Sequence, residues 1–417
     1  MDASLERLTI RRYIQAMVFQ GIWTAGQFLF PFVLAKSLAA PGWLVTVAVI
    51  METTGMMLAL YWGQLMDTGG RGRWLVWGGL GGRVVLVAAL LVQTAGQFVV
   101  LLGIVYFFSA MVYPAQNSIL QANLRPERHG QVFGLGSRVQ LLTAAVTSLA
   151  VGAVLERDPD LFRWVYPTLG VLGFGYPLLL ASLPGPVARV ANEPGVFAVP
   201  RLPAGPIRWG RVLRTLASPF VETARTFRAA PDFRRYEDAF MIYGVAFMML
   251  APVVPLFFAH ELNLSYQQIT TARVLIASLG VGLLGPLAGR LMDRIKPARL
   301  CAISFGLMAL FPVTLALGKY LLPGEPVGAA YLAFAVYSVG MAGINVAWNV
   351  GSISFAPPGL GGRYQAIHVA LVGARGLLGP LIGFVILEFL GYREVFAGAA
   401  LLFPKAMMFI LVMILTV

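Results

Sequence analysis

The chain has 417 residues, of which 58% are hydrophobic and 12% charged, and its mean hydropathy is +0.78. These values exclude a soluble globular protein, because water cannot be the main neighbour of so apolar a surface. In a soluble protein a net charge of +13 would suggest binding to nucleic acid. Here most of the basic residues lie in segments on one side of the predicted membrane. The composition therefore predicts an all-α membrane protein with no nucleic-acid partner.

Apolar runs of about 20 residues recur between short polar segments, and each is long enough to cross a hydrocarbon core of ~30 Å as a helix. We predict twelve such spans, six in each half of the chain. In chain order they cover residues 13–35, 42–66, 74–94, 97–121, 131–155, 163–183, 236–260, 266–291, 299–318, 328–351, 364–388 and 394–415. The first is not a secretion signal, since it is too long for the apolar core of one.

Two motifs occur twice, once in each half of the chain. The pattern R-R-Y-x-x-A at 11–16 returns at 234–239, and G-x-L-M-D at 63–67 returns at 289–293. Tandem repeats of several helices in an apolar chain are typical of transporters built from two matching lobes. We therefore predict two six-helix lobes, one over residues 1–183 and the other over residues 234–417.

The predicted linker between the lobes covers residues 184–233 and begins with a proline-rich stretch that cannot form a regular helix. Further on, Trp209 and Leu213 share one helical face while Arg208 and Arg211 are set off from it. This pattern indicates a basic amphipathic helix, which fits the surface of an anionic inner leaflet. A strap packed under the lobes is an equally good interpretation.

Basic residues are distributed unevenly between the two sides of the predicted spans. With the N-terminus placed in the cytoplasm, the inner segments hold 22 of the 31 Lys and Arg residues, Arg83 among them, and the outer segments hold five. This asymmetry follows the positive-inside rule and predicts that both termini are cytoplasmic. The preference for arginine over lysine is typical of a GC-rich bacterial genome, so we expect the bacterial inner membrane.

The loop after the second predicted span resembles the signature loop of the major facilitator superfamily. It reads G-Q-L-M-D-T-G-G-R-G-R over residues 63–73, against the family pattern G-x-x-x-D-R-x-G-R-[RK]-[RK], so Thr68 replaces the usual arginine. In this pattern a glycine lets two helices approach closely, and arginines face the anionic leaflet. The resemblance implies a cytoplasmic gating loop formed by Gly63, Asp67, Gly70, Arg71 and Arg73, and in the second copy by Gly289, Asp293 and Arg294.

The resemblance also implies the fold and the mechanism. It implies twelve transmembrane helices in two lobes, each built from 3+3 inverted repeats, and secondary transport by alternating access. The similarity to drug/proton antiporters is partial, because the fourth span lacks an arginine and the fifth lacks a Gly-Pro step. A comparable glycine pattern occurs at 373–383 in the eleventh span, where we interpret it as close helix packing.

Ionisable side chains inside predicted spans are costly there and usually face the protein interior. In the superfamily layout, the spans that carry Glu52 and Arg375 face each other across a central cavity, with the two residues at similar depth. We predict that Glu52 is the proton- or charge-coupling acid, and that it switches between Arg375 and a proton. A static ion pair with no role in coupling is the alternative.

The residues predicted to line the substrate cavity are Arg138, Arg273, His368, Gln116, Asn117, Asn345 and Asn349. The amides among them either bind substrate or satisfy each other between helices. The excess of arginine suits an anionic or zwitterionic solute, whereas the aromatic residues of the spans suit an amphipathic drug-like molecule. Lys405, in the last span, receives no role.

We expect a secondary active transporter that exports a small organic solute in exchange for protons. Proton-coupled uptake of an organic anion is the alternative, and a non-transporting membrane sensor or scaffold is the alternative from another class. We expect neither an enzyme nor a cofactor or metal, because Cys301 and three scattered histidines form no such pattern and no Walker loop is present. The expected partners are substrate, protons and a bilayer with an anionic inner leaflet, and the expected state is a monomer.

Overall fold

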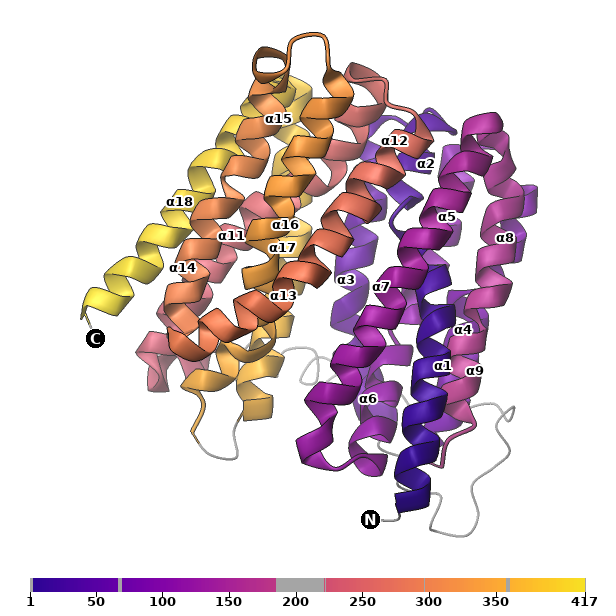
Figure 1. Cartoon of the computed structure of the whole chain (residues 1–417), viewed down its shortest axis with the longest axis vertical. Helices are drawn as coiled ribbons and strands as arrows, with labels where there is room; N and C mark the ends of the chain where they lie inside the picture. Colours follow the sequence, from indigo (N-terminus) through magenta and orange to yellow (C-terminus); the bar gives the residue numbers. More distant parts are fainter. Residues whose placement is uncertain are drawn as a thin grey trace. The chain divides into compact units, whose positions relative to one another are not determined.

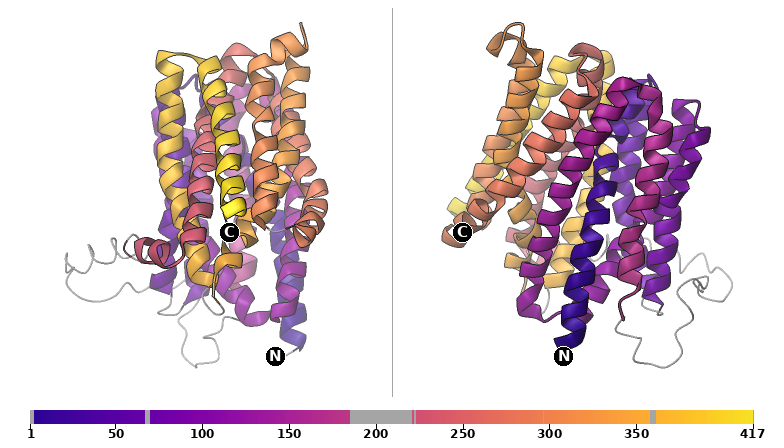
Figure 2. Two further views of the ribbon diagram at one scale, coloured as in Figure 1. Left: turned by 90° about the vertical axis from the view of Figure 1, so that its left-hand side faces the viewer. Right: turned by 45° about the vertical axis from the view of Figure 1, so that its right-hand side comes forward.

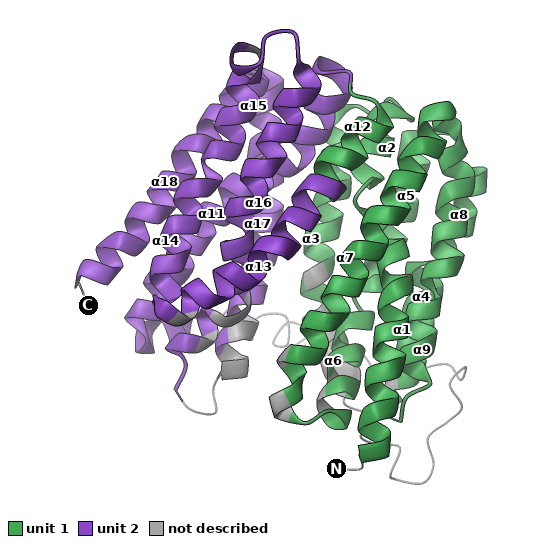
Figure 3. Ribbon diagram, in the orientation of Figure 1, with its two compact units in different colours: residues 1–203, 264–274 green, residues 204–263, 275–417 purple. Residues whose placement is uncertain are grey.

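The structure is a computed structural model that describes residues 3–66, 70–184, 221, 223–295, 297–357 and 361–416. The described residues are almost entirely helical (Figure 1). They group into two compact units, shown in separate colours in Figure 3. Unit 1 comprises residues 1–203 and 264–274, and unit 2 comprises residues 204–263 and 275–417. Within each unit the long helices lie side by side along a common direction (Figure 2).

Eleven helical stretches of the described residues are long and apolar enough to span a membrane. They support the predicted multi-pass membrane protein. The remaining predicted span, 42–66, coincides with one helix, but within the described residues its apolar stretch is the shorter Gly42–Gly55. The arrangement of twelve spans as six plus six therefore stays a prediction. The predicted linker helix around Trp209 lies outside the described residues.

Unit 1 contains the helices from the N-terminal half and one short helix from further along the chain. In chain order they are α1 (Ala3–Gln27), α2 (Phe30–Lys36), α3 (Gly42–Met66), α4 (Arg71–Gly82), η1 (Val84–Leu91), α5 (Ala95–Ser109), α6 (Val112–Asn123), α7 (Pro126–Arg157), η2 (Pro159–Leu161), α8 (Phe162–Gly173), α9 (Gly175–Ala181) and α12 (Tyr266–Thr270). A capping box at Thr94 starts α5, and another at Ser265 starts α12.

Helices α1 and α7 pack closely because small residues leave room for their backbones. A β-carbon on Gly21 would lie 2.6 Å from the carbonyl oxygen of Gln140, and one on Gly136 would lie 2.5 Å from the ring of Tyr13. The Gln140 amide also donates to the hydroxyl of Thr24 at 3.0 Å. Such close approach of small residues is how helices associate in lipid, where no hydrophobic force drives them together.

Unit 2 contains the remaining helices. They are α11 (Pro231–Leu256), η3 (Phe257–Glu261), α13 (Ala277–Arg294), α14 (Pro297–Met308), α15 (Leu310–Leu321), α16 (Pro326–Val350), η5 (Ser352–Phe355), α17 (Gly361–Phe389) and α18 (Tyr392–Thr416). The π-helical stretch η4 (Thr271–Ile276) begins in unit 1 and ends in unit 2. Proline at or next to the first helical position starts α11 and α16, where its missing N–H costs nothing.

The glycine pattern of the eleventh predicted span packs helix α17 against α11, as predicted. A β-carbon on Gly379 would lie 2.5 Å from the β-carbon of Met248, and one on Gly383 would lie 2.3 Å from the carbonyl oxygen of Met249. Side chains larger than hydrogen do not fit at these positions without backbone movement. This tight interface positions the polar residues of α17 against α11.

Candidate functional site

Glu52 on α3 lies in a small polar cluster within unit 1. The amide of Gln27, at the end of α1, donates to its Oε1 at 3.1 Å. Tyr106 on α5 is a second hydrogen-bond partner of the carboxylate, and the positive charge of Arg273 attracts it. The side chain is half-buried. An acid in a predicted membrane span is thus held by two neutral donors and one cation, and in such a site a proton can replace the cation.

Arg273 reaches this cluster from the other half of the sequence. It lies on η4, in the part of that stretch that belongs to unit 1, and its guanidinium stands 4.9 Å from the ring centre of Phe28. The cation–π contact and the attraction to Glu52 place the two charged groups in one site. The structure therefore brings Glu52 and Arg273 together, although 221 residues separate them. Arg375 belongs to unit 2, so its expected pairing with Glu52 stays a prediction.

The other predicted cavity residues of unit 1 differ in their surroundings. Arg138 on α7 is exposed. The Gln116 amide donates to the side-chain oxygen of the neighbouring Asn117 at 3.2 Å, while its own oxygen is buried without a hydrogen-bond partner in the described structure. The two amides on α6 therefore satisfy each other in part, and the free oxygen of Gln116 can still accept a hydrogen bond.

In unit 2, His368 on α17 pairs with a residue that the sequence analysis did not single out. Its Nδ1 lies 2.9 Å from Oε2 and 3.0 Å from Oε1 of Glu237 on α11, and both side chains are almost fully buried. The imidazole is held between aromatic rings, with Phe240 at 4.9 Å and Trp348 at 5.7 Å between ring centres. Its other nitrogen, Nε2, is buried and has no hydrogen-bond partner among the described residues.

Arg375 lies two turns after His368 on the same helix and reaches the same face of α11. It is 3% exposed and donates from Nη1 to the carbonyl oxygen of Phe240 at 2.9 Å. Its guanidinium also lies 5.8 Å from the Phe240 ring and is attracted by the charge of Glu237. A β-carbon on Gly244 would collide with the arginine side chain, so this glycine makes its room. The carboxylate of Glu237 thus interacts with two basic side chains, His368 and Arg375.

Arg83 is a second buried arginine, and the structure corrects its predicted position. We counted it with the inner loops, but it lies within the apolar stretch Gly72–Leu91 and is 3% exposed. It donates to the carbonyl oxygen of Gly173 and to the side-chain oxygen of Gln20. Its guanidinium also stands 4.8 Å from the ring centre of Tyr176. Neutral oxygens and aromatic faces therefore hold this cation and join three helices of unit 1.

The predicted gating loop is described in part. Asp67 lies outside the described residues, and the structure describes only the backbone of Arg71 and Asp293. Gly70 has a left-handed φ of 73° and precedes α4, a conformation that favours glycine. Arg73 packs over it and is 8% exposed, so it does not face the leaflet as we expected.

The remaining predicted residues are Gly63, Gly289, Arg294, Asn345 and Asn349. The structure does not describe the side chain of Asn349 or the contacts around Gly63. Arg294 and Asn345 are exposed. A β-carbon on Gly289 would meet nothing within 4 Å, so close helix packing does not explain the glycine of the second motif copy.

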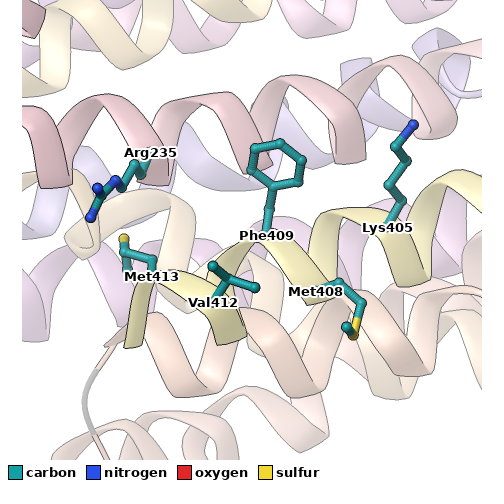
Figure 4. A pocket seen from close by; sticks show the side chains of 6 residues that line it. All are labelled: Arg235, Lys405, Met408, Phe409, Val412 and Met413. Carbon is teal, nitrogen blue, oxygen red and sulfur yellow. The ribbon is translucent and has the colours of Figure 1, made fainter. Parts of the chain in front are cut away.

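A groove of about 400 Å³ lies on unit 2 between α11 and α18 (Figure 4). Arg235 stands at one end and Lys405 at the other, with Met408, Phe409, Val412 and Met413 between them. None of the predicted cavity residues lines it. Lys405 is therefore a cation on the outside of α18, and we place it outside the candidate site.

Two of the functional candidates could not be found by the reasoning we applied to the sequence. Glu237 sits at the edge of its predicted span among charged residues, where a carboxylate normally faces water. Its presence one position after the repeated R-R-Y motif was the available signal. Arg83 lies nine residues inside its predicted span, and that depth was the signal for it. Among the described residues, no three His, Cys, Asp or Glu side chains gather as they would around a metal ion.

Comparison with known proteins shows which family and which solved structures this chain is similar to. The family model of the Major Facilitator Superfamily matches residues 239–416. A crystal structure of the human organic anion transporter MFSD10 (TETRAN) is similar, with a TM-score of 0.64 and 16% identity over 98% of this chain and 100% of that chain. No curated protein sequence matches the chain.

Two further solved structures share the fold across the chain. The peptide transporter POT in complex with sulfate gives a TM-score of 0.71 and 13% identity over 99% of this chain and 93% of that one. A bacterial homolog of the human lysosomal transporter Spinster gives a TM-score of 0.63 and 13% identity over 99% of this chain and 96% of that one. The second half of the chain thus matches the Major Facilitator Superfamily, the whole chain shares the fold of these transporters, and the matches assign no subfamily.

Proposed function

We propose that the protein is a proton-coupled exporter of a small organic solute that works by alternating access in the bacterial inner membrane, with both termini in the cytoplasm. The match to the Major Facilitator Superfamily and the transporter fold support secondary transport in general. The direction, the coupling ion and the membrane are our proposal. The observation that supports it is the setting of Glu52, a carboxylate in a predicted membrane span that faces a cation and two neutral donors.

Proton coupling requires a group whose charge can be neutralised inside the membrane at modest cost. A charged carboxylate there is expensive, and an attractive arginine offsets part of that cost. When a proton neutralises the acid, the arginine loses its partner, so protonation and ion pairing exclude each other. Glu52 meets these requirements in unit 1, and we propose it as the coupling acid.

The Glu237–His368 pair lies in unit 2, where the histidine is fully buried beside the carboxylate and Arg375 is near. We propose that this pair stabilises unit 2. The predicted gating loop and the predicted cavity residues keep their roles as proposals.

Proton-coupled uptake of an organic anion is the second candidate, and the arginines inside the spans favour it. Arg83, Arg273 and Arg375 lie within candidate membrane spans, and arginine matches the geometry of carboxylates and phosphates. Among proteins with this fold, MFSD10 is an organic anion transporter, and POT has been crystallised with sulfate. Arg273 is the most accessible of the three, so a bound anion would meet it first.

Thermal unfolding of the purified protein with a ligand panel separates the two candidates. The panel contains tetraphenylphosphonium and ethidium as lipophilic cations, and benzoate and glycerol 3-phosphate as anions. A ligand at ~100 times its dissociation constant adds about 2.7 kcal/mol to the folded state. Stabilisation by an anion, lost on Arg273→Gln, supports the uptake of anions. Stabilisation by the cations alone, unchanged by that substitution, supports export of amphiphiles.

Replacing Glu52 by glutamine tests the proposed coupling. In liposomes with an imposed pH gradient, we expect the wild-type protein to drive flux of the panel compound that stabilises it. Glu52→Gln should lose at least about tenfold of this gradient-driven flux while still exchanging labelled for unlabelled compound, because the uncharged amide binds no coupling proton. Glu388→Gln removes an exposed carboxylate on α17 and serves as the control. Gradient-driven flux that survives in Glu52→Gln would contradict the role of this residue.

A further inference from the structure

Residues 264–274, which we call the docked segment, come from the second half of the sequence but belong to unit 1. The segment contains α12 and the first residues of η4, and α12 has the colour of unit 1 in Figure 3. The residues on both sides of it, Asn263 and Leu275, belong to unit 2. The chain therefore enters unit 1 for 11 residues and leaves it again.

Polar contacts hold the start of the docked segment. The ammonium of Lys36 donates to the carbonyl oxygen of Leu264 at 2.7 Å. The Tyr266 hydroxyl lies 2.6 Å from the Ser37 hydroxyl, and the Tyr266 backbone N–H donates to Oε2 of Glu156 at 2.6 Å. These partners come from the end of α2 and the end of α7. Two of the contacts involve a charged group, and such hydrogen bonds are stronger than neutral ones.

The middle and the end of the docked segment are held by packing and by charge. A β-carbon on Gly152 of α7 would lie 2.6 Å from the hydroxyl of Thr270, so no larger residue separates the two helices. At the end of the segment, Arg273 stacks on Phe28 and is attracted by Glu52. The proposed coupling acid therefore acts on one end of a segment whose other end is held by hydrogen bonds.

The backbone on both sides of the docked segment departs from the ordinary α-helix. The π-helical stretch η3 precedes it, Asn263 has a left-handed φ of 46°, and the π-helical stretch η4 contains its end. π-Helical turns are rare and occur frequently at functional sites, where they let a helix change its hydrogen bonding locally. The segment is thus joined to unit 2 through two places where the helix is already interrupted.

We propose that Arg273 is the ion partner of Glu52, and that the docked segment is released from unit 1 when Glu52 takes up a proton. The proton binds a carboxylate oxygen, the acid becomes neutral, and Arg273 loses its attraction to Glu52, one of the contacts that hold its end of the segment. Among the described residues, the groups that interact with Glu52 are Gln27 from α1, Tyr106 from α5, Tyr113 from α6 and Arg273 itself. Arg273 is the cation among these groups, so its end of the segment responds most strongly to the proton.

This inference rests on the proposed coupling role of Glu52, and it names the event that protonation triggers. In the sequence-based hypothesis Arg375 is the partner of Glu52. The two hypotheses differ in a measurable way, because one predicts a response in the docked segment and the other does not. A substitution at a fixed pH can imitate the proton, so neither a substrate nor a pH change is needed for the first test.

Hydrogen exchange of the backbone amides of residues 264–274 provides this test. At one pH and in the same detergent, Glu52→Gln and Arg273→Gln should each speed exchange in this segment at least about fivefold over the wild type. The double variant should be no faster than the faster single variant, because both remove the same interaction. Exchange that stays at the wild-type rate in Glu52→Gln would overturn the proposal. The proposal would also be overturned if the effects of Glu52→Gln and Arg273→Gln on this exchange rate were additive while those of Glu52→Gln and Arg375→Met were not.

A disulfide that locks the segment to unit 1 provides a second, independent test. A β-carbon on Gly152 would lie 3.0 Å from the Cγ2 of Thr270, so the double variant Gly152→Cys/Thr270→Cys brings two β-carbons near the ~3.8 Å that a disulfide requires. Oxidation should stop gradient-driven flux in liposomes, and dithiothreitol should restore it. Each single cysteine variant, which keeps the buried Cys301, controls for other cross-links.

The outcomes separate failure of this inference from failure of the proposed function. If the oxidised double variant still transports, the docked segment need not move, and the inference is wrong while proton-driven transport stands. If the wild-type protein shows no gradient-driven flux with any panel compound, the proposed function is wrong. Faster hydrogen exchange in Glu52→Gln would then still support the pairing of Glu52 with Arg273.

Discussion

Replacing Glu237 by leucine is expected to lower the free energy of unfolding by about 3–5 kcal/mol, the cost of removing one partner from a buried charge pair. The carboxylate is 1% exposed and lies 2.9 Å from His368, and its charge also attracts Arg375. Without it, a buried guanidinium keeps a backbone carbonyl as a partner but loses its nearby negative charge. Unfolding in increasing sodium dodecyl sulfate, followed by circular dichroism, measures the loss.

Asp238→Leu is the matched control for this prediction. Asp238 follows Glu237 on the same helix, but it is 45% exposed and pairs with Arg234 at 3.7 Å near the surface. An exposed ion pair contributes about 0–1 kcal/mol, so the control should lose no more than that. Equal losses in the two variants would mean that the buried pair does not stabilise unit 2 in the way we describe.

Gly383→Ala is expected to destabilise the protein by about 1–3 kcal/mol although it adds a single methyl group. The new β-carbon would lie 2.3 Å from the carbonyl oxygen of Met249 and 2.9 Å from its α-carbon. These are backbone atoms of α11, so no side chain can turn aside, and the two helices must separate. The same unfolding measurement in detergent applies.

Gly289→Ala provides the comparison in the same unit. It lies inside α13, where a β-carbon would meet nothing within 4 Å. Alanine there should stabilise the helix by up to about 1 kcal/mol, because glycine loses more conformational freedom on folding. An unchanged free energy of unfolding in Gly383→Ala, or a large decrease in Gly289→Ala, would contradict the close packing at Gly383 and the open space at Gly289 that the structure shows.

The helical membrane fold could be predicted because the apolar runs that specify it can be recognised along the sequence alone. A bilayer requires about 20 consecutive apolar residues for each helical span, and such runs are visible without knowledge of tertiary contacts. The family model that matches residues 239–416 agrees with the resemblance that the motif loop indicated. The count of twelve spans depends on residues 42–66, which the structure describes in part.

The pairing of charges could not be predicted, because it depends on which helices meet. Arg375 lies seven positions after His368, a spacing that puts both residues on one face of a helix, and in the structure both reach α11. Their partner Glu237 is 131 residues away from His368, and no local pattern links the two. Likewise, the entry of residues 264–274 into unit 1 arises from tertiary packing, and it alone brings Arg273 to Glu52.

Arg83 shows how a one-dimensional reading of charge can mislead. Cytoplasmic loops of membrane proteins carry an excess of Lys and Arg, so we counted Arg83 with Arg71 and Arg73, which precede it in the sequence. In the structure two neutral oxygens and the faces of Trp23 and Tyr176 surround its guanidinium. Aromatic residues and amides on three other helices compensate this charge, and a count of basic residues along the chain does not include them.

Gradient-driven flux in liposomes tests the central claim, proton-coupled transport, most directly. The purified protein is reconstituted, a pH gradient is imposed, and accumulation of the panel compound that stabilises the protein is followed with and without a protonophore. The account predicts accumulation above the equilibrium level in the wild type, its collapse with the protonophore, and its loss in Glu52→Gln. Equal, gradient-independent distribution of every panel compound, by protein that unfolds cooperatively in the same preparation, would contradict it.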